Sequence, residues 1–285
     1  MDRKIHIMGI VNLTGDSFYA GSRVSSTSAP DRIRKMLAEG ADIVDLGACS
    51  TRPGAPQPSL EEEWSRLEPV LRQLSGLAEG FPSTSLRDPV RANVPGKPSA
   101  RPVFSIDTYR SEIVRRAYEL IGPFMVNDIS AGEMDPEMLQ TVGRLGLPYV
   151  AMHMRGTPET MQQFTQYGDL VEDIKAYFRD FASKAADAGI AQWLLDPGFG
   201  FSKTLEQNWE LLRRLEELHE LNRPILVGVS RKSMIYKALG ITPEEAMPAT
   251  QVVQYAALQR GARWLRVHDV AEAVRTARLF TLLRP

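Results

Sequence analysis

The sequence has a single cysteine, Cys49, among its 285 residues. One thiol excludes an intramolecular disulfide and any metal site built from several cysteines, and it suits a reducing compartment. Runs of about 18 consecutive apolar residues are absent, so we expect no membrane span. The N-terminal apolar stretch is short, is broken by His6 and is followed by no small-residue cleavage site, which indicates a strand rather than a signal peptide.

An excess of charge of either sign is also lacking. The 34 Lys and Arg residues nearly balance the 35 Asp and Glu residues, for a formal net charge of -1. The chain therefore carries no bulk attraction to nucleic acid or to an anionic membrane, and any anion site must be local. With 43% hydrophobic and 24% charged residues, the composition excludes disordered, collagen-like and coiled-coil chains.

Short runs rich in apolar and β-branched residues alternate with amphipathic segments, a pattern typical of parallel strands joined by helices. The predicted strands are residues 5–11, 43–46, 103–106, 124–126, 149–152, 193–195, 225–229 and 264–267. The predicted helices are residues 31–39, 60–77, 111–120, 136–145, 170–188, 205–218, 243–259 and 269–283. Eight such alternations favour one α/β domain over residues 1–285, a TIM (β/α)8 barrel, rather than an open doubly wound sheet.

Local signals mark helix starts and long loops. Residues 59–62 and 242–245 fit the capping box, in which two side chains satisfy free N–H groups at a helix start. Residues 80–102 contain five prolines and no periodicity, so we expect an inserted loop on the face opposite the chemistry. Residues 14–29 and 48–59 follow the first two strands, and we expect these loops to overhang the active-site mouth.

Polar side chains stand at or just beyond the carboxyl ends of the predicted strands. Any one of them alone would be explained as a strand terminator or a helix cap. In a β/α barrel, however, these positions meet at one mouth, where loops from different strands build the active site. They are Asn12, Asp45, Asp107, Asn127, Asp128, His153, Asp196, Ser230, Arg231, Lys232, Arg266 and His268.

Several of these residues lie in motifs that resemble those of the dihydropteroate synthase family. The first is residues 7–18, with the sequence IMGIVNLTGDSF, and the second is STRPGA at residues 50–55. SIDT, VNDI, MHM, DPGFGF, SRKS and RVHD follow in order, starting at residues 105, 126, 152, 196, 230 and 266. The resemblance spans nearly the whole chain. Gly15 stands where the family usually has proline, and Ala48 with Cys49 replaces a usual Gly–Glu pair.

The resemblance implies that 4-aminobenzoate displaces diphosphate from (7,8-dihydropterin-6-yl)methyl diphosphate, giving 7,8-dihydropteroate for folate biosynthesis. A carboxylate suits the paired N–H donors of a pterin edge, and we assign this role to Asp196. Asp107 and Asn127 would read other ring heteroatoms, and Lys232 would donate to a ring acceptor. Met152 and Phe199 would form the apolar faces of the slot, although a methionine at a strand end is often a core residue.

The leaving diphosphate needs cations and hydrogen-bond donors where negative charge accumulates. We expect Asn12, Arg266 and His268 there, because the first and eighth strands are neighbours in a closed barrel. The resemblance implies Mg2+, held by Asn12 and phosphate oxygens. The residues expected to carry the chemistry are Asn12, Asp107, Lys232, Arg266 and His268. His268 alone would be taken as an ordinary surface histidine.

The 4-aminobenzoate site is expected to be built from residues on three loops. They are Thr51, Arg52, Pro53, Phe199, Ser230 and Lys232. Arg52 has an equal alternative as a loop-to-body salt bridge, and Lys203 is left out as a solvated side chain. Asp45 is expected to orient Asn12 or Thr51, and Cys49 to have no catalytic role.

Partners and location follow from the resemblance. We expect a cytoplasmic enzyme that forms a homodimer through late helices, uses two small-molecule substrates, and is inhibited competitively by sulfonamides. Nucleic acid and membrane partners are not expected. Two other functions compete with this one: a methyltransferase on a pterin-binding barrel, and a pterin-binding homologue without activity. The STRPGA and SRKS loops disfavour the first, and the presence of the expected diphosphate and aminobenzoate residues disfavours the second.

Overall fold

The computed structural model describes residues 4–13, 28–49, 57–75 and 104–283. The predicted insertion at residues 80–102 lies outside the described residues. So do residues 14–27 and 50–56, which make up most of the two loops expected over the mouth.

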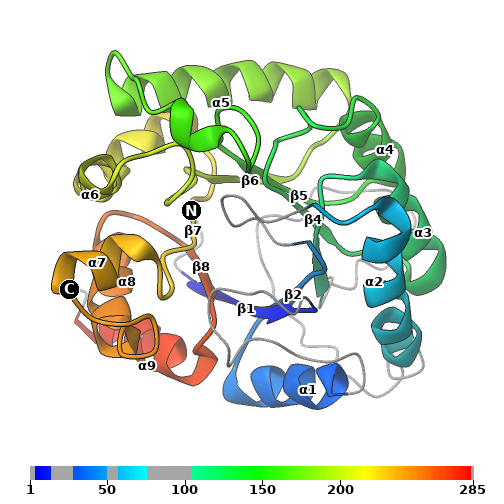
Figure 1. The fold of residues 1–285 in the computed structure, drawn as a ribbon, viewed down its shortest axis with the longest axis horizontal. Coiled ribbons are helices and arrows are strands. Elements are labelled where there is room, and N and C mark those ends of the chain that lie inside the picture. The colour runs from blue at the N-terminus through cyan, green and yellow to red at the C-terminus, as the bar shows by residue number, and fades with distance from the viewer. Residues whose placement is uncertain (1–3, 14–27, 50–56, 76–103, 284–285) are drawn as a thin grey trace.

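The described strands form a single parallel sheet in the order β6-β5-β4-β3-β2-β1-β8-β7. An isolated parallel bridge between Leu195 and Ile225 joins the two outer strands, so the sheet closes on itself. Helices surround it as an outer ring (Figure 1). The predicted TIM barrel is therefore confirmed. The strands are β1 His6–Asn12, β2 Ile43–Gly47, β3 Phe104–Asp107, β4 Met125–Asp128, β5 Tyr149–Met152, β6 Trp193–Asp196, β7 Leu226–Val227 and β8 Trp264–Val267.

The helices follow the predicted order, with differences that include the unpredicted 3-10 helix Met161–Gln163. The predicted helix 205–218 ends early and continues as a 3-10 segment, and a short helix at Ser233–Leu239 was not predicted. None of the helices among the described residues is long and apolar enough to cross a membrane. The helices are α1 Ala29–Glu39, α2 Leu60–Ser75, α3 Ser111–Ile121, α4 Met138–Leu145, η2 Met161–Gln163, α5 Leu170–Asp187, α6 Leu205–Arg213, η3 Leu215–Leu221, α7 Ser233–Leu239, α8 Met247–Gln259 and α9 Val270–Leu282.

Both predicted capping boxes form, but only one starts a helix. Ser59 and Glu62 exchange backbone-to-side-chain hydrogen bonds of 2.7 and 3.2 Å at the start of α2. Thr242 and Glu245 make the same exchange, at 2.9 and 3.4 Å, yet they enclose a turn, and α8 begins only at Met247. The helix therefore starts later than predicted because the box closes a separate turn ahead of it.

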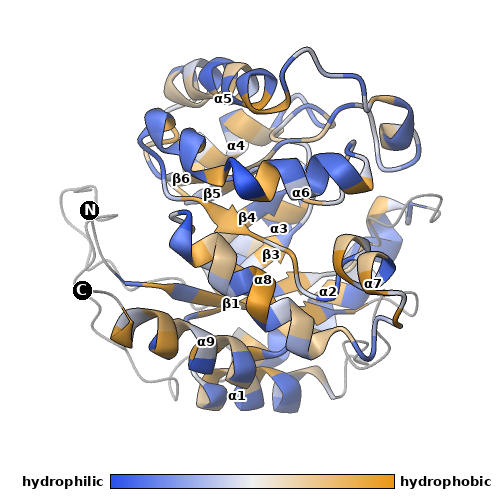
Figure 2. Cartoon of the chain, turned by 90° about the vertical axis from the view of Figure 1, so that its left-hand side faces the viewer, coloured by the Kyte–Doolittle hydropathy of each residue, from blue (hydrophilic) through white to orange (hydrophobic). Residues whose placement is uncertain are grey.

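The hydrophobic core between strands and helices comes from one side of each strand. Along β1, Ile7 and Val11 belong to this core, which continues onto the inner faces of the helices. Gly9 lies between them, and a side chain there would meet Met36 of α1 and Val270 of α9 at 2.9 and 3.0 Å. Figure 2 shows hydrophobic residues along the strands and polar residues on the outer helix faces.

The other side of each strand points into the barrel, because side chains alternate along a strand. Near the amino ends of the strands these inward residues are apolar, and they form a second, smaller cluster. Trp264 packs against this cluster. The cluster fills the barrel interior like the lowest layers of other β/α barrels. It consists of Met8, Ile43, Met125, Val150, Leu194 and Leu226.

Candidate active site

Beyond the apolar layer, several of the inward positions carry polar side chains. Because side chains alternate, Ile43 is followed on the same side by Asp45, and Leu194 by Asp196. The same step gives Asn127 after Met125 and Arg266 after Trp264, while Asn12 and Asp107 follow Ile10 and Ser105 on the inward sides of β1 and β3. The predicted site residues of the strands therefore belong to one layer at the carboxyl end of the barrel.

Arg266 is the centre of this polar layer. Its Nε donates to Asp45 Oδ2 at 2.7 Å, and its Nη2 donates to Asp107 Oδ2 at 2.6 Å. Asn127 Nδ2 donates to the same Asp45 oxygen at 3.1 Å. Burial disfavours the charge of Arg266, but Asp45 and Asp107 outweigh it and hold the pKa of Arg266 above its ordinary value. The guanidinium therefore stays charged and fixed.

Asp45 was expected to orient Asn12 or Thr51. Among the described residues, its carboxylate accepts hydrogen bonds from Arg266 and Asn127. The reason is its inward position on β2, from which a fully buried carboxylate requires cationic and amide donors. Asp45 therefore orients Arg266 and Asn127, and Thr51 lies outside the described residues.

Asn12 and Asp107 lie on the two strands that flank β2. Gly47 pairs with Asn12 on one side and with Asp107 on the other. A side-chain carbon on Gly47 would lie 3.6 Å from Asn12 Oδ1 and 3.5 Å from Asp107 Oδ2. Burial raises the pKa of Asp107 to about 7, against the opposing charge of Arg266. The glycine leaves room between two oxygen-bearing side chains.

A second glycine stands beneath Asp196 and Lys232. A side-chain carbon on Gly228 would lie 4.0 Å from Asp196 Oδ2, 4.0 Å from Lys232 Nζ and 3.9 Å from Arg266 Cβ. Burial raises the pKa of Asp196, and it lowers the pKa of Lys232 to about 8. Each group supports the charge of the other. The structure thus brings Asp196, Lys232 and Arg266 together, as predicted.

The loop after β6 corrects one prediction. The ring of Phe199 is fully buried in the core between strands and helices, so it does not form a wall of either substrate site. Its carbonyl oxygen accepts a hydrogen bond from Lys232 Nζ instead. The aromatic ring at the mouth belongs to Phe201, which is partly exposed and lies 4.9 Å from Lys232 Nζ. Gly198 and Gly200 have φ angles of 72° and 83°. They turn the chain just before Phe199 and between Phe199 and Phe201.

Met152 lies where it was predicted, at the end of β5 and in register with Asp196. It belongs to a small apolar cluster separate from the main core, and Phe201 packs against that cluster. Two apolar side chains thus line the side of the polar layer formed by β5 and β6. This arrangement offers an apolar surface for a planar ring beside polar groups for its edge.

The structure also corrects the prediction for Lys203. It was expected to be solvated, but it is 3% exposed. Its Nζ lies 3.0 Å from His153 Nδ1 and donates to the carbonyl oxygens of Gly198 at 3.0 Å and Phe201 at 3.1 Å. A lysine in the sequence gives no sign of burial unless its distant partner, here His153, is known.

The loops after β7 and β8 are joined by two contacts. His268 donates its backbone N–H to Ser230 Oγ at 3.2 Å, and its ring Nδ1 lies 3.1 Å from the same oxygen. Arg231 forms a two-pronged pair with Asp269 at 2.8 and 3.0 Å. Burial first, and the nearby Arg266 second, lower the pKa of His268 to about 3, so the ring is neutral at pH 7. A neutral imidazole binds phosphate by donating one N–H.

Cys49 has no features of a nucleophile. Burial and the nearby carboxylate of Glu63 raise the pKa of its thiol far above the usual range. Arg110 lies beside it, with Nη1 3.6 Å from the sulfur, and also pairs with Glu63. The thiol is therefore protonated at neutral pH, in agreement with the prediction that it takes no part in catalysis. Thr51, Arg52 and Pro53 lie outside the described residues, so their predicted roles stay predictions.

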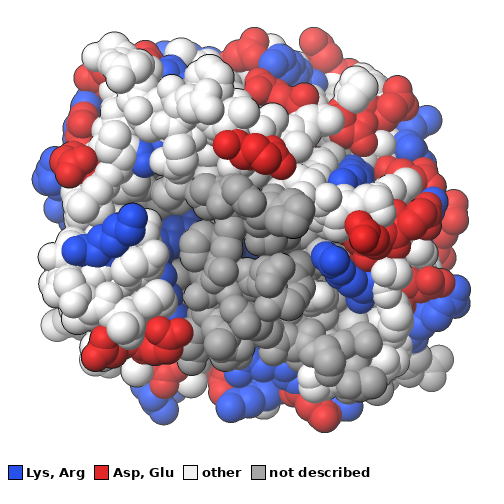
Figure 3. Space-filling model, in the orientation of Figure 1, with Lys and Arg blue, Asp and Glu red and all other residues white. Residues whose placement is uncertain are grey.

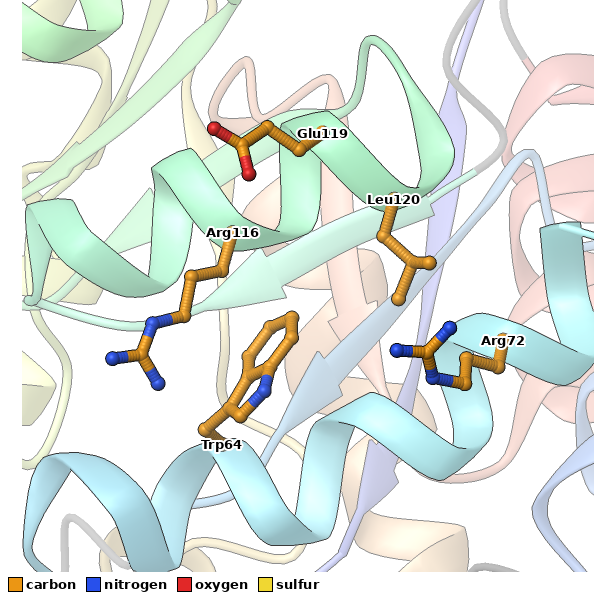
Figure 4. Close-up of a pocket in the computed structure, with 5 residues that line it drawn as sticks. All are labelled: Trp64, Arg72, Arg116, Glu119 and Leu120. Atoms are coloured by element: carbon orange, nitrogen blue, oxygen red, sulfur yellow. The ribbon is translucent and has the colours of Figure 1, made fainter.

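On the face seen in Figure 3, basic and acidic side chains lie side by side around the rim. A hollow of about 380 Å3 on the outer surface lies away from the polar layer, between α2 and α3 (Figure 4). Its arginines are already paired: Arg116 with Glu61 and Glu112, and Arg72 with Glu68. It therefore offers little charge to an anion. The hollow is lined by Trp64, Arg72, Arg116, Glu119 and Leu120.

The geometry defines a class of enzyme: a (β/α)8 barrel whose mouth combines acceptors and donors for a planar heterocycle, an apolar wall and a charged arginine. The family model described as "Pterin binding enzyme" matches residues 8–83 and 89–268. The chain belongs to the pterin binding enzyme family.

Relatives of known identity agree with this assignment. The dihydropteroate synthase of Escherichia coli strain K12 is 38% identical over 277 residues, covering 96% of this chain and 90% of its own. A Yersinia pestis dihydropteroate synthase in a sulfonamide drug complex aligns with a TM-score of 0.84 at 34% identity, over 98% of this chain and 93% of its own. The dihydropteroate synthase of Thermus thermophilus in complex with 4-aminobenzoate aligns with a TM-score of 0.79 at 36% identity, over 99% of this chain and 95% of its own.

Proposed function

We propose that the chain is a dihydropteroate synthase, a transferase that joins (7,8-dihydropterin-6-yl)methyl diphosphate to 4-aminobenzoate and releases diphosphate. One observation carries the proposal. Side chains from separate strands, predicted for this reaction, share one polar layer at the mouth of the barrel, linked through Arg266 and around Gly47 and Gly228. The relatives from Escherichia coli and Yersinia pestis carry this name.

The pterin ring would lie across the polar layer with its amino edge on Asp196. One oxygen of Asp196 already accepts the Gly198 N–H at 2.8 Å, which fixes the carboxylate and leaves the other oxygen beside Lys232 for the ligand. Asn127 and Asp107 would meet other ring heteroatoms. The ring face would lie against Met152. Because these groups are fixed before binding, little side-chain entropy is lost.

The diphosphate would lie between β1 and β8, which are paired neighbours. Arg266, the neutral His268 and Asn12 supply a cation, a donor and an amide there. Mg2+ suits this place, because Asn12 has an amide oxygen there and the leaving group brings phosphate oxygens, ligands of the type that Mg2+ prefers. Asn12 would hold the ion. When bound, Mg2+ would neutralise charge on the leaving diphosphate.

The 4-aminobenzoate ring would pack against Phe201 rather than Phe199, near the stem of Lys232. Ser230, Thr51, Arg52 and Pro53 stay the predicted partners for the remainder of this substrate. Ser230 Oγ accepts the backbone N–H of His268, and it would bind the carboxylate by donating its own hydrogen. The sulfonamide in the Yersinia pestis complex suggests the same pocket for these inhibitors.

The reaction needs no strong base, because an arylamine is a neutral nucleophile at pH 7. Diphosphate would depart first, and the amine would capture the delocalised cation left on the pterin methylene. The amine nitrogen forms the new bond to that carbon and then loses its proton to solvent. The residues contribute position and electrostatic stabilisation: Arg266 and His268 at the leaving group, and Asp107 and Asp196 near the cation.

A homodimer is also proposed, through α8 and α9. These helices pack on one another, with the rings of Tyr255 and Phe280 5.7 Å apart. Large apolar side chains remain exposed on them: Val252 is 69%, Leu279 57% and Leu282 80% exposed. A shared apolar face of this kind suits a symmetric interface. Light scattering of the purified protein tests the dimer, and Val252→Asp would convert it to a monomer.

The function is tested directly by product identification. Purified protein with Mg2+ and both substrates should release diphosphate and form 7,8-dihydropteroate, identified by mass spectrometry. Tight pterin binding without product would indicate a binding homologue, and methyl transfer from a methylated pterin in a parallel assay would indicate the methyltransferase. We place the enzyme in the cytoplasm, where a single unpaired cysteine stays reduced.

A further inference from the structure

The loop that follows β6 is tied to the barrel by one buried lysine. Lys203 Nζ contacts His153 Nδ1 at 3.0 Å, Gly198 O at 3.0 Å and Phe201 O at 3.1 Å. These three contacts use all three donors of an ammonium group. The lysine is 3% exposed, and its amine is enclosed by this loop and by His153, which follows β5.

The backbone of His153 fixes the position of the loop. Its backbone N–H donates to the Asp196 carbonyl at 2.9 Å, and its own carbonyl lies directly against Gly198. A side-chain carbon on Gly198 would come within 2.0 Å of that carbonyl, and the φ angle of this glycine is 72°. Burial holds the pKa of His153 well below its ordinary value, so its neutral ring accepts a hydrogen bond from Lys203 at Nδ1.

Lys203 binds the carbonyl groups of Gly198 and Phe201, and the loop groups proposed to contact the substrates lie within residues 198–201. The N–H of Gly198 fixes the Asp196 carboxylate at 2.8 Å. The carbonyl of Phe199 accepts from Lys232, and the ring of Phe201 lies 4.9 Å from the same amine. A shift of the loop would therefore disturb the proposed pterin and aminobenzoate contacts together.

The charge of Lys203 has an additional effect. Burial opposes it and lowers the pKa of Lys203 to about 7, while the nearby Asp196 favours it. In return, Lys232, Arg266 and Lys203 all favour the ionised form of Asp196, which burial disfavours. Gly198 N–H acts in the same direction. Removing Lys203 would therefore move the titration of Asp196 toward higher pH.

We propose that Lys203 is a positioning residue for the condensation: it ties Gly198, Phe201 and His153 together and so presents Asp196 and the Phe201 ring to the substrates. It acts through these groups and touches no reacting atom. The inference rests on the proposed function, because it assumes that Asp196 and Phe201 bind the two substrates.

The test is Lys203→Met, which keeps the apolar stem and removes the donors. The matched control is Lys175→Met. Lys175 is a lysine of α5 that is 2% exposed and pairs with Glu172 and Glu220, outside the mouth. In Lys203→Met, the KM for both substrates should rise by about tenfold or more, as for the loss of charge-assisted hydrogen bonds. Lys175→Met should keep both KM values, even where its melting temperature falls.

A pH profile separates positioning from general loss of structure. The acid limb of pterin affinity should move to higher pH in Lys203→Met and stay in place in Lys175→Met. His153→Asn keeps an acceptor where Nδ1 stood and should retain near wild-type KM values, whereas His153→Leu should behave like Lys203→Met. If Lys203→Met does not fold, the comparison of His153→Asn with His153→Leu tests the same inference.

Two results would overturn the inference. One is Lys203→Met with wild-type KM values and an unmoved acid limb; the other is equal KM changes in Lys203→Met and Lys175→Met. Wild-type protein that forms no dihydropteroate would instead refute the proposed function. The two failures are therefore distinguished by the wild-type measurement alone.

Discussion

Replacing Asp196 by asparagine tests the proposed pterin contact most directly. One carboxylate oxygen accepts the Gly198 N–H at 2.8 Å, and the other lies near Lys232. In Asp196→Asn the amide oxygen keeps the bond to Gly198, so the amide NH2 turns toward the cavity and toward the lysine. The variant therefore loses a charged acceptor and places a donor against the N–H groups of the pterin.

The loss of a hydrogen bond to a charged group costs about 1.5 to 3 kcal/mol, which corresponds to roughly 10- to 150-fold weaker binding. Isothermal titration calorimetry with a stable pterin measures this change. Asp128→Asn is the matched control. Asp128 is also a buried carboxylate at a strand end, but it faces away from the barrel interior and binds Tyr149 at 2.6 Å and Ser130 at 2.7 Å.

The expected pattern is a large loss of pterin affinity in Asp196→Asn and a lower melting temperature with wild-type affinity in Asp128→Asn. Folded Asp196→Asn with wild-type affinity would show that the pterin edge lies elsewhere. Equal losses in both variants would show that strand-end carboxylates act through stability alone.

Other predictions address the remaining parts of the site. Because burial raises the pKa of Asp196, pterin affinity should fall as pH decreases, starting above the usual range of an aspartate, and a titration at several pH values would reveal a flat profile if this is wrong. Phe201→Ala should raise the KM for 4-aminobenzoate, whereas Phe199→Ala should chiefly reduce the free energy of unfolding, by about 3 to 5 kcal/mol; steady-state kinetics and urea unfolding would contradict this if the two effects were exchanged. Chelation of Mg2+ should abolish condensation, and Asn12→Ala should need more Mg2+ for half-maximal rate; a rate indifferent to chelator argues against the ion. Sulfonamides should raise the apparent KM for 4-aminobenzoate without lowering kcat, and inhibition insensitive to that substrate would exclude a shared pocket.

Much of the barrel was predictable because its inner surface follows a simple period. On each of two strands an apolar residue is followed two positions later by a polar one: Met125 by Asn127, and Leu194 by Asp196. Strand geometry converts this spacing into a shared face without any knowledge of the remaining chain. The strand predicted at residues 225–229 is present but shorter, at Leu226–Val227. Helix α7 was not predicted, because its seven residues are too few for a clear helical period.

The wrong predictions concern loop residues, where the spacing of residues in the sequence does not determine which way their side chains point. Phe199 and Phe201 are two residues apart, as on a strand, but the glycines between and before them have positive φ angles, so one ring enters the core and the other faces the mouth. Burial of Lys203 depends on His153, fifty positions earlier in the chain. Such contacts arise from the closed barrel and leave no pattern in the loop itself.

The glycines at 47 and 228 bear on how inhibitor resistance would evolve. A methyl group at either position would meet its neighbours only at ordinary contact distances of 3.5 to 4.0 Å, so the folded protein would tolerate alanine. The same methyl group would occupy space between the polar side chains that the natural pterin is proposed to fill. An inhibitor confined to that space would therefore leave the organism few escape mutations, because a change that excludes the drug also excludes the substrate.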